Sequence, residues 1–232
     1  MIAKDDVFVV IINEKKYLSN AERELILNSD IIISDTALEK SKIWSVLQNY
    51  KGTYLNVWWN NAANSSSIAS KTNEIEHIAA IRDALSEINP NKKWTYYDNA
   101  GTYIQTLGDT YTKLYDRIRG YNHSNFIIVW KNIHDFLADF GLEKYNMGTL
   151  ETTEKTNQVI WEEVLSMLQM KNIWIIFTDS ESTRQIITPL LKKTHAQIYI
   201  FPQIEEDTSE WWYIRYIEKM MNIFVSAFDT YD

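Results

Sequence analysis

Acidic side chains follow one of the strand-like apolar runs of this sequence, and they are its best candidates for chemistry. Asp179 and Glu181 come directly after the run 173–178. In an open parallel sheet, ligands bind beyond the carboxyl ends of the strands. Two carboxylates there could hold a cation or form an acid–base pair. The segment Asp179-Ser180 could equally cap the helix that follows, which is the simpler interpretation.

Other polar and aromatic residues follow similar runs along the chain. They are Glu14 after the run 7–12, Trp58 and Trp59 at the end of the run 54–58, and Trp130 and Lys131 at the end of the run 126–130. The tryptophans could stack against a ligand, although packing in the core or between lobes explains them more simply.

A metal site is not predicted from histidine spacing. The four histidines are His77, His123, His134 and His195. None follows a strand directly, and no His-x-x-x-His pair occurs, whereas zinc sites need three or four converging ligands. The one Glu-x-x-His pair, Glu74 with His77, falls within a helical pattern. His134, one helical turn past Trp130, is the histidine best placed to act as a ligand.

Catalytic motifs are missing as well. The sequence contains no Gly-x-Gly-x-x-Gly, no Gly-Lys-Ser/Thr and no Gly-x-Ser-x-Gly, which are the motifs of phosphate-binding loops and of a nucleophile elbow. No catalytic residue is predicted, and we expect this protein not to be an enzyme.

Composition narrows the possible partners. The net charge of −8 argues against nucleic acid and anionic lipid as main partners, since both require clustered lysine and arginine. The absence of cysteine excludes disulfides and thiolate metal sites. The apolar runs are too short to cross a bilayer, so no transmembrane segment is predicted. The start of the sequence shows no signal-peptide pattern, which fits either a cytoplasmic protein or a chain that begins after a removed leader.

Apolar runs alternate with helical patterns, which predicts an α/β fold with mainly parallel sheets. Strands are expected at 7–12, 30–34, 54–58, 126–130, 173–178 and 197–201, all buried on both faces. Helices are expected at 20–28, 36–49, 75–85, 132–140, 154–170, 182–193 and 212–228, with Asn20 and Thr36 as N-caps. Asn89-Pro90 should end the helix before it.

The longest helical pattern covers residues 94–118. Trp94, Tyr97, Gly101, Ile104, Gly108, Tyr111, Tyr115 and Ile118 are spaced by threes and fours, which places them on one face. A helix of this length spans roughly 37 Å. We therefore predict two small lobes, at 1–92 and 121–232, joined by a spine helix at 93–120.

This order of motifs resembles the solute-binding proteins of zinc and manganese ABC transporters, in which one long helix joins two lobes. The matching segments are Tyr97-x-Asn99-Ala100-x-x-Tyr103-x-x-x-Leu107, Asn28 to Ile32, Val57-Trp58, Phe126 to Leu142, Ile176 to Thr178 and Ser209 to Tyr216. The resemblance runs from about residue 7 to 228. Relative to this family, the first strand and helix of the amino-terminal lobe are missing.

The family's metal ligands are mostly replaced in this sequence. The resemblance places the two histidines of the first lobe at Glu14 and Asn56, and the histidine of the second lobe at Trp130, with Lys131 beside it. The acidic position after a strand is kept as Asp179. The last aspartate falls near Pro202 or Gln203. Asparagine is a poor zinc ligand and tryptophan is none, so the metal site that the family implies is degenerate.

Two functions remain open. In the first, the chain has lost ordinary zinc or manganese binding and acts as a surface binding or adhesion protein with an aromatic cleft at Trp58, Trp59 and Trp130. In the second, it is a metal receptor that binds a cation in a remodelled inter-lobe site, through ligands such as Glu14, Asp179, Glu181 and His134. Lys131 would lie in the same cleft, where its ammonium group would repel the ion. The resemblance implies an ABC permease or a surface protein as partner. It also implies an extracellular location, with a membrane-anchoring leader outside this chain.

Overall fold

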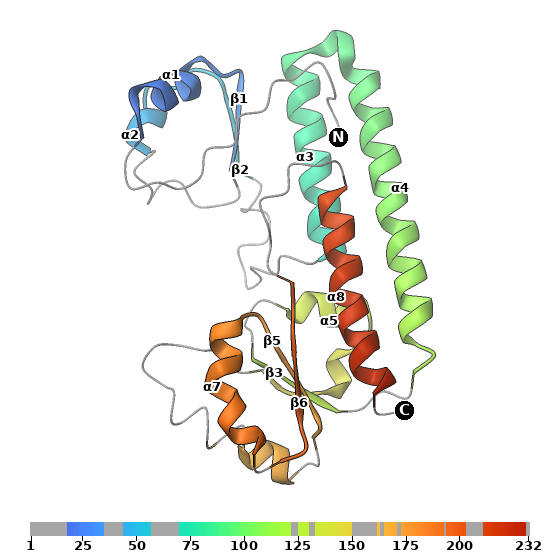
Figure 1. Ribbon diagram of the computed structural model, residues 1–232. Coiled ribbons are helices and arrows are strands. Elements are labelled where there is room, and N and C mark those ends of the chain that lie inside the picture. The colour runs from blue at the N-terminus through green and yellow to red at the C-terminus, as the bar shows by residue number, and fades with distance from the viewer. Residues whose placement is uncertain are drawn as a thin grey trace. The chain divides into compact units, whose positions relative to one another are not determined.

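The computed structural model describes residues 18–34, 44–56, 70–121, 125–129, 133–149, 162, 165–170, 173–192, 194–202 and 211–230. The chain forms two compact units (Figure 1). Unit 1 comprises residues 1–65 and 72–106, and unit 2 comprises residues 66–71 and 107–232. The division falls inside the long helix, between residues 106 and 107.

The first half of the chain alternates helices and strands, as the sequence predicts. It contains α1 (Asn20–Asn28), β1 (Ile31–Ser34), α2 (Trp44–Leu47), β2 (Thr53–Asn56), α3 (Lys71–Ile88), the 3₁₀ turn η4 (Pro90–Lys92) and α4 (Lys93–Ile118). Strands β1 and β2 are parallel, with Ile31 opposite Thr53. The expected burial of β1 on both faces is wrong, because Ile33 is 44% exposed. In the described residues, β2 is the one strand that pairs with β1.

The N-cap of helix α1 lies one residue before the predicted one. Ser19, not Asn20, is the N-cap. Its hydroxyl accepts a hydrogen bond from the Glu22 amide (3.2 Å), and the Ser19 amide donates to the Glu22 carboxylate (2.8 Å). This reciprocal capping box satisfies two amides that the helix itself leaves free. The spacing Ser-x-x-Glu was a signal for it in the sequence.

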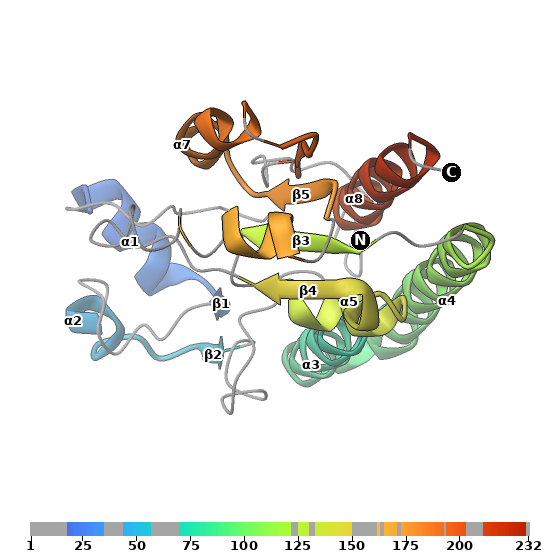
Figure 2. The same ribbon diagram turned by 90° about the horizontal axis from the view of Figure 1, so that it is seen from below.

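In the described residues of unit 2, four parallel strands form a sheet in the order β4-β3-β5-β6. Figure 2 shows three of them, β4, β3 and β5, side by side. The strands are β3 (Phe126–Val129), β4 (Asn146–Thr149), β5 (Ile175–Thr178) and β6 (Gln197–Ile200). Helices α5 (His134–Asp139), α7 (Glu181–Leu191) and α8 (Trp212–Asp229) are among the described helices of this unit, with the short turn η5 (Glu143–Tyr145) before β4. Both β3 and β5 are fully buried, which confirms their expected burial on two faces.

The two faces of this sheet pack against different kinds of side chain. Successive strand residues point to opposite faces. Ile127, Val129 and Ile176 pack in an aliphatic cluster with Ile187 of α7. Aromatic rings pack against one another on the other side of the same strands, and they come from β3, β5, α5 and α8: Phe126, Phe177, Phe136, Phe224 and Phe228. This three-layer core fixes the carboxyl ends of the strands.

Helix α4 is confirmed, but the face that contains Trp94 and Tyr115 is not the buried one. The buried side chains are Tyr96, Ala100, Leu107, Tyr111, Leu114 and Ile118, whereas Trp94 is 82% exposed and Tyr115 is 44% exposed. Two helical stripes overlap in this sequence, and both contain Tyr111 and Ile118. Contacts from other elements bury the stripe that contains Tyr96 and not the one that contains Trp94. Tyr96 packs with Leu85 and Ile31, and Tyr111 stacks on Phe140 at 5.0 Å.

The first residue of α3, Lys71, belongs to unit 2 and is held by other residues of that unit. The Lys71 amide donates to Asp139 Oδ2 at 2.8 Å, and the buried Tyr213 hydroxyl donates to the Ser70 carbonyl at 3.3 Å. Burial raises the pKa of Asp139, while the hydrogen bond from the Lys71 amide acts in the opposite direction. Asp139 thus caps a helix that begins 68 residues before it.

We expect Asp139→Ala to destabilise the start of α3 by about 1–2 kcal/mol, because a capping carboxylate and its favourable position at a helix N-terminus are both lost. Hydrogen exchange of the amides at residues 71–75 measures this change. Asp135→Ala, on the same helix, is the matched control and should leave these amides protected. Equal protection in wild type and Asp139→Ala would contradict the capping role.

Candidate functional site

The carboxyl ends of the strands in unit 2 form one edge of the sheet. In the parallel register, Val129 lies opposite Thr178, and Thr178 lies opposite Ile200. The Phe201 amide donates to the Thr178 carbonyl at 2.8 Å, which extends the pairing beyond β6. Asp179 is therefore held at this edge, in the position expected from the sequence.

Thr178 and Asp179 bring oxygen ligands to this edge. Thr178 is fully buried, and its hydroxyl has no hydrogen-bond partner within the described part of the chain. Asp179 is partly exposed. A carboxylate and a hydroxyl are ligands for hard cations such as Mn²⁺ rather than the nitrogen and sulfur set that zinc usually takes.

The helix after this edge is capped by Ser180. The Ser180 hydroxyl accepts from the Thr183 amide at 3.2 Å and donates to the Thr183 hydroxyl at 2.8 Å. The hydrogen bond from the Thr183 amide confirms that the segment Asp179-Ser180 caps helix α7, and it identifies Ser180 as the capping residue.

Glu181 and His134 have local ionic partners. Glu181 Oε2 lies 3.2 Å from Arg184 Nη1, with both side chains at least half exposed. His134 Nδ1 lies 3.6 Å from Asp135 Oδ1, and the histidine side chain is 81% exposed. His195 lies beside Trp174, with ring centres 5.9 Å apart. Glu181, His134 and His195 therefore each contact another side chain close by.

Asn56 is the last residue of β2 and lies opposite Ser34 of β1. It is thus at the carboxyl end of a parallel strand, and its role as a ligand position stays a prediction. The predicted site residues Glu14, Trp58, Trp59, Trp130 and Lys131 lie outside the described residues. Among the described residues, no three His, Asp or Glu side chains are grouped so that they could hold a metal ion.

One ionisable group in unit 1 was not predicted as a special residue. Glu74 of α3 is partly buried, and the Tyr103 hydroxyl of α4 donates to its carboxylate at 3.4 Å. Burial raises the pKa of Glu74 to about 7, and the hydrogen bond from Tyr103 opposes this shift. Antiparallel pairing of α3 and α4 around Pro90 was the sequence signal that could have brought the two residues together.

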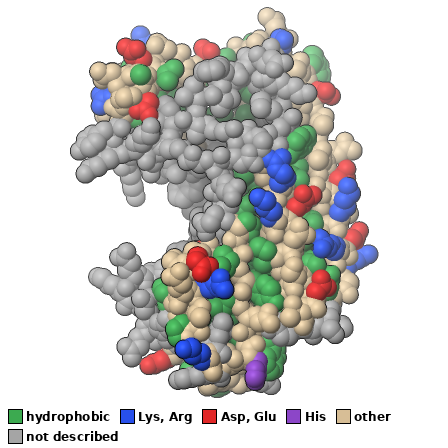
Figure 3. Space-filling model, viewed as in Figure 1, with side chains coloured by type: hydrophobic (Ala, Val, Ile, Leu, Met, Phe, Trp, Pro, Cys, Tyr) green, Lys and Arg blue, Asp and Glu red, His purple; other side chains and the backbone are tan. Residues whose placement is uncertain are grey.

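Charges of both signs are mixed on the surface. On the face that Figure 3 shows, Lys and Arg side chains alternate with Asp and Glu side chains, without a broad basic patch on its described part. No helix in the described ranges is both long and apolar enough to cross a membrane.

Solved structures share this fold over almost the whole chain. A periplasmic metal-binding protein from Candidatus Liberibacter asiaticus has a TM-score of 0.73 at 18% identity, covering 98% of this chain and 93% of the other. Its Mn-bound form has a TM-score of 0.68 at 16% identity, covering 92% and 86%. The laminin-binding protein of Streptococcus pyogenes has a TM-score of 0.74 at 13% identity, covering 98% and 92%. No curated protein matches the chain significantly.

The sequence itself matches one protein family. The family described as zinc-uptake complex component A, periplasmic, matches residues 53–227. This range includes α3, α4 and the whole described sheet of unit 2. The chain therefore belongs to the family of the periplasmic component A of zinc-uptake complexes, whose members are solute receptors of metal transport and not enzymes.

Proposed function

We propose that this chain is a receptor-type binding protein that has lost ordinary zinc and manganese binding and acts outside the cytoplasm as a surface binding or adhesion protein. The observation that carries the proposal is the loss of imidazole from the family's ligand positions. The resemblance assigns Glu14, Asn56 and Trp130 to these positions, and the two described histidines of unit 2 lie beside Asp135 and Trp174. Replacing several ligands together removes most of the coordination energy.

An adhesive role has support from one structural relative, which is described as a laminin-binding protein. The proposed partner is then a protein at the cell surface, and the aromatic residues Trp58, Trp59 and Trp130 are the proposed contact residues. Retention at the surface would use a membrane-anchoring leader encoded before this chain.

A second function is favoured by Asp179. Asp179 directly follows β5, where the resemblance places the family's acidic ligand, and the buried Thr178 precedes it. A remodelled receptor would add ligands from Glu14, Asn56, His134 or Glu181 and deliver its metal to an ABC permease. Because most of these ligands are oxygens, such a site would prefer Mn²⁺ to Zn²⁺.

Thermal unfolding of the metal-stripped protein, with zinc or manganese added, separates the two functions. A ligand that binds only the folded state adds about 2.7 kcal/mol of stability at about a hundredfold excess over Kd. We expect no saturable shift with either metal at micromolar concentration, because the imidazole ligands are lost.

A saturable shift that Asp179→Ala removes would contradict the main proposal and establish the metal receptor. Glu143→Ala is the matched control, since it removes one exposed carboxylate elsewhere in unit 2. A shift that both variants reduce equally would report general cation binding to an acidic protein, and the loss of the specific site would stand.

A further inference from the structure

Two tyrosine–carboxylate pairs join α3 to α4 in unit 1. Close to the turn between these helices, the Tyr97 hydroxyl of α4 donates to Asp83 of α3 at 3.1 Å, and we call these two residues the turn pair. Further along both helices, the Tyr103 hydroxyl donates to Glu74 at 3.4 Å, and we call these two residues the distal pair. Both pairs place a phenol of α4 on a carboxyl group of α3. They differ in what surrounds that carboxyl group.

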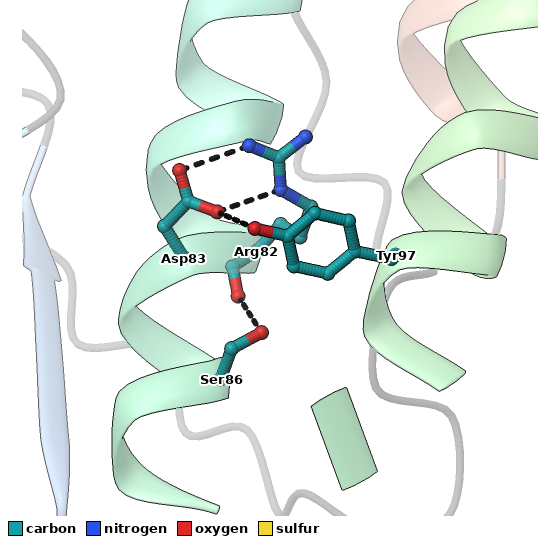
Figure 4. Close-up of polar contacts among 4 residues, drawn as sticks. All are labelled: Arg82, Asp83, Ser86 and Tyr97. Atoms are coloured by element: carbon teal, nitrogen blue, oxygen red, sulfur yellow. Dashed lines mark hydrogen bonds and ion pairs between the residues drawn. The ribbon is translucent and has the colours of Figure 1, made fainter. Parts of the chain in front are cut away.

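The carboxylate of the turn pair lies beside a cation. Figure 4 shows Arg82 and Tyr97 bonded to the same Asp83 side chain. Arg82 donates two hydrogen bonds to it, at 2.8 and 2.9 Å, and the Asp83 side chain is 51% exposed. The hydrogen bond from Arg82 is the largest of the effects that lower the pKa of Asp83. The turn pair is therefore ionised at every pH from mildly acidic upward.

The carboxyl group of the distal pair has a different environment. Glu74 is partly buried, and it forms no ion pair within the described part of the chain. Lys71 and His77 lie one helical turn from it on α3, and the Lys71 ammonium lies over the Tyr111 ring, 5.7 Å from its centre. Burial is the largest effect on the pKa of Glu74 and raises it to about 7, while the hydrogen bond from Tyr103 opposes this shift.

Two titratable groups of unit 2 hold the residues that precede this part of α3. Asp139 accepts from the Lys71 amide, and the Tyr213 hydroxyl donates to the Ser70 carbonyl. Along α3 itself, Asp83 follows Glu74 by nine residues, which is roughly 13 Å at 1.5 Å per residue. At about 0.1 M salt, charges act over about 10 Å. The two pairs therefore respond to pH largely independently of each other.

We propose that the distal pair is a proton-operated contact within unit 1: α3 and α4 stay packed at Tyr103 while Glu74 is protonated, and this end of the helix pair opens to water when Glu74 ionises. A carboxylate held there loses hydration that a single phenol hydrogen bond does not replace. The turn pair keeps its hydrogen bonds through this change, because Asp83 is already charged. Unit 1 thus has one end of its helix pair that responds to pH and one that does not.

Hydrogen exchange of the full chain tests this contact. Protection is expressed relative to an unstructured peptide at the same pH, which removes the direct effect of pH on exchange. Between about pH 4.5 and about pH 7 the packed form binds more protons than the open form, so protection falls as pH rises. From about pH 5 to about pH 8, we expect amides 75–78 and 102–105 to lose about thirtyfold in protection, a value reduced for partial exposure. Amides 83–86 should change less than about threefold.

Three variants separate the two pairs. Glu74→Gln should abolish the change of protection with pH, because glutamine does not ionise. Tyr103→Phe removes the hydrogen bond that opposes the raised pKa of Glu74, so the midpoint of the change should move to higher pH. Tyr97→Phe is the matched control, because it removes the same hydroxyl from the turn pair. It should lower protection of amides 83–86 about threefold at both pH values and leave the midpoint unchanged.

A midpoint that moves in Tyr103→Phe and stays in Tyr97→Phe supports the proposal. Equal protection of amides 75–78 at both pH values overturns it, as does a loss with rising pH that Glu74→Gln retains. An equal loss at both ends of the helix pair also overturns it, since unit 1 would then loosen as a whole.

Discussion

Phe224→Ala should lower the free energy of unfolding of unit 2 by about 3–5 kcal/mol, the usual cost of removing a ring from a closed core. Phe224 is fully buried, and its ring centre lies 4.4 Å from that of Phe177 and 5.3 Å from that of Phe201. It also packs against Phe126 and Phe136, so the cavity would be walled by rigid rings that cannot close over it.

Hydrogen exchange measures this loss of stability separately for each unit. Amides of β3 and β5 should exchange about a thousandfold faster for a loss of about 4 kcal/mol, because their exchange requires opening of the core. Amides of α1 belong to unit 1 and serve as an internal reference. Tyr115→Ala is the control variant, since this aromatic side chain is 44% exposed. A loss below about 1 kcal/mol for Phe224→Ala would show that the ring is not enclosed.

Glu74→Gln should change how stability depends on pH. Burial raises the pKa of Glu74 to about 7 in the folded protein, whereas an unfolded glutamate has a pKa near 4.3. Between these values the folded state binds more protons than the unfolded state. Stability contributed by this group therefore falls as pH rises from about 4.5 to about 7, and stays low above that.

Glutamine cannot ionise, so the stability of the variant should not show this decrease with rising pH. At about pH 8 we expect it to be about 2 kcal/mol more stable than wild type, a value reduced from the full shift because the carboxyl is partly exposed. Near pH 4.5 the two proteins should be equally stable. Denaturant unfolding across this range measures the difference, with Glu76→Gln as the exposed control. A difference that does not vary with pH would contradict the raised pKa.

The strands at the centre of unit 2 were predictable because each consists largely of consecutive apolar residues. The runs that contain β3 and β5 are apolar on both faces, which only a central parallel strand requires. β4 was missed, because Asn146-Met147-Gly148-Thr149 has no such run and pairs with β3 through a shifted register. An edge strand is defined by its neighbour rather than by its own composition.

The candidate site was predictable only in part. The position of Asp179 follows from the end of a strongly apolar run, because carboxyl ends of parallel strands share one edge. The Ser180 cap was one of two interpretations that the sequence allowed, and its hydrogen bond to Thr183 was decided by local geometry. Glu74 shows no sequence signal of its own, since its pKa depends on α4 and on burial.

The sequence by itself determined the α/β class, the long helix, the end of α3 before Pro90 and the motifs that assign the family. These features depend on residues close together in the chain, where periodicity and backbone preferences act directly. The tertiary structure decided that Tyr96 is buried while Trp94 is exposed. It also decided that Asp139 caps a helix 68 residues away. Such outcomes depend on which distant surfaces meet, and burial and long-range hydrogen bonds exist only after they have met.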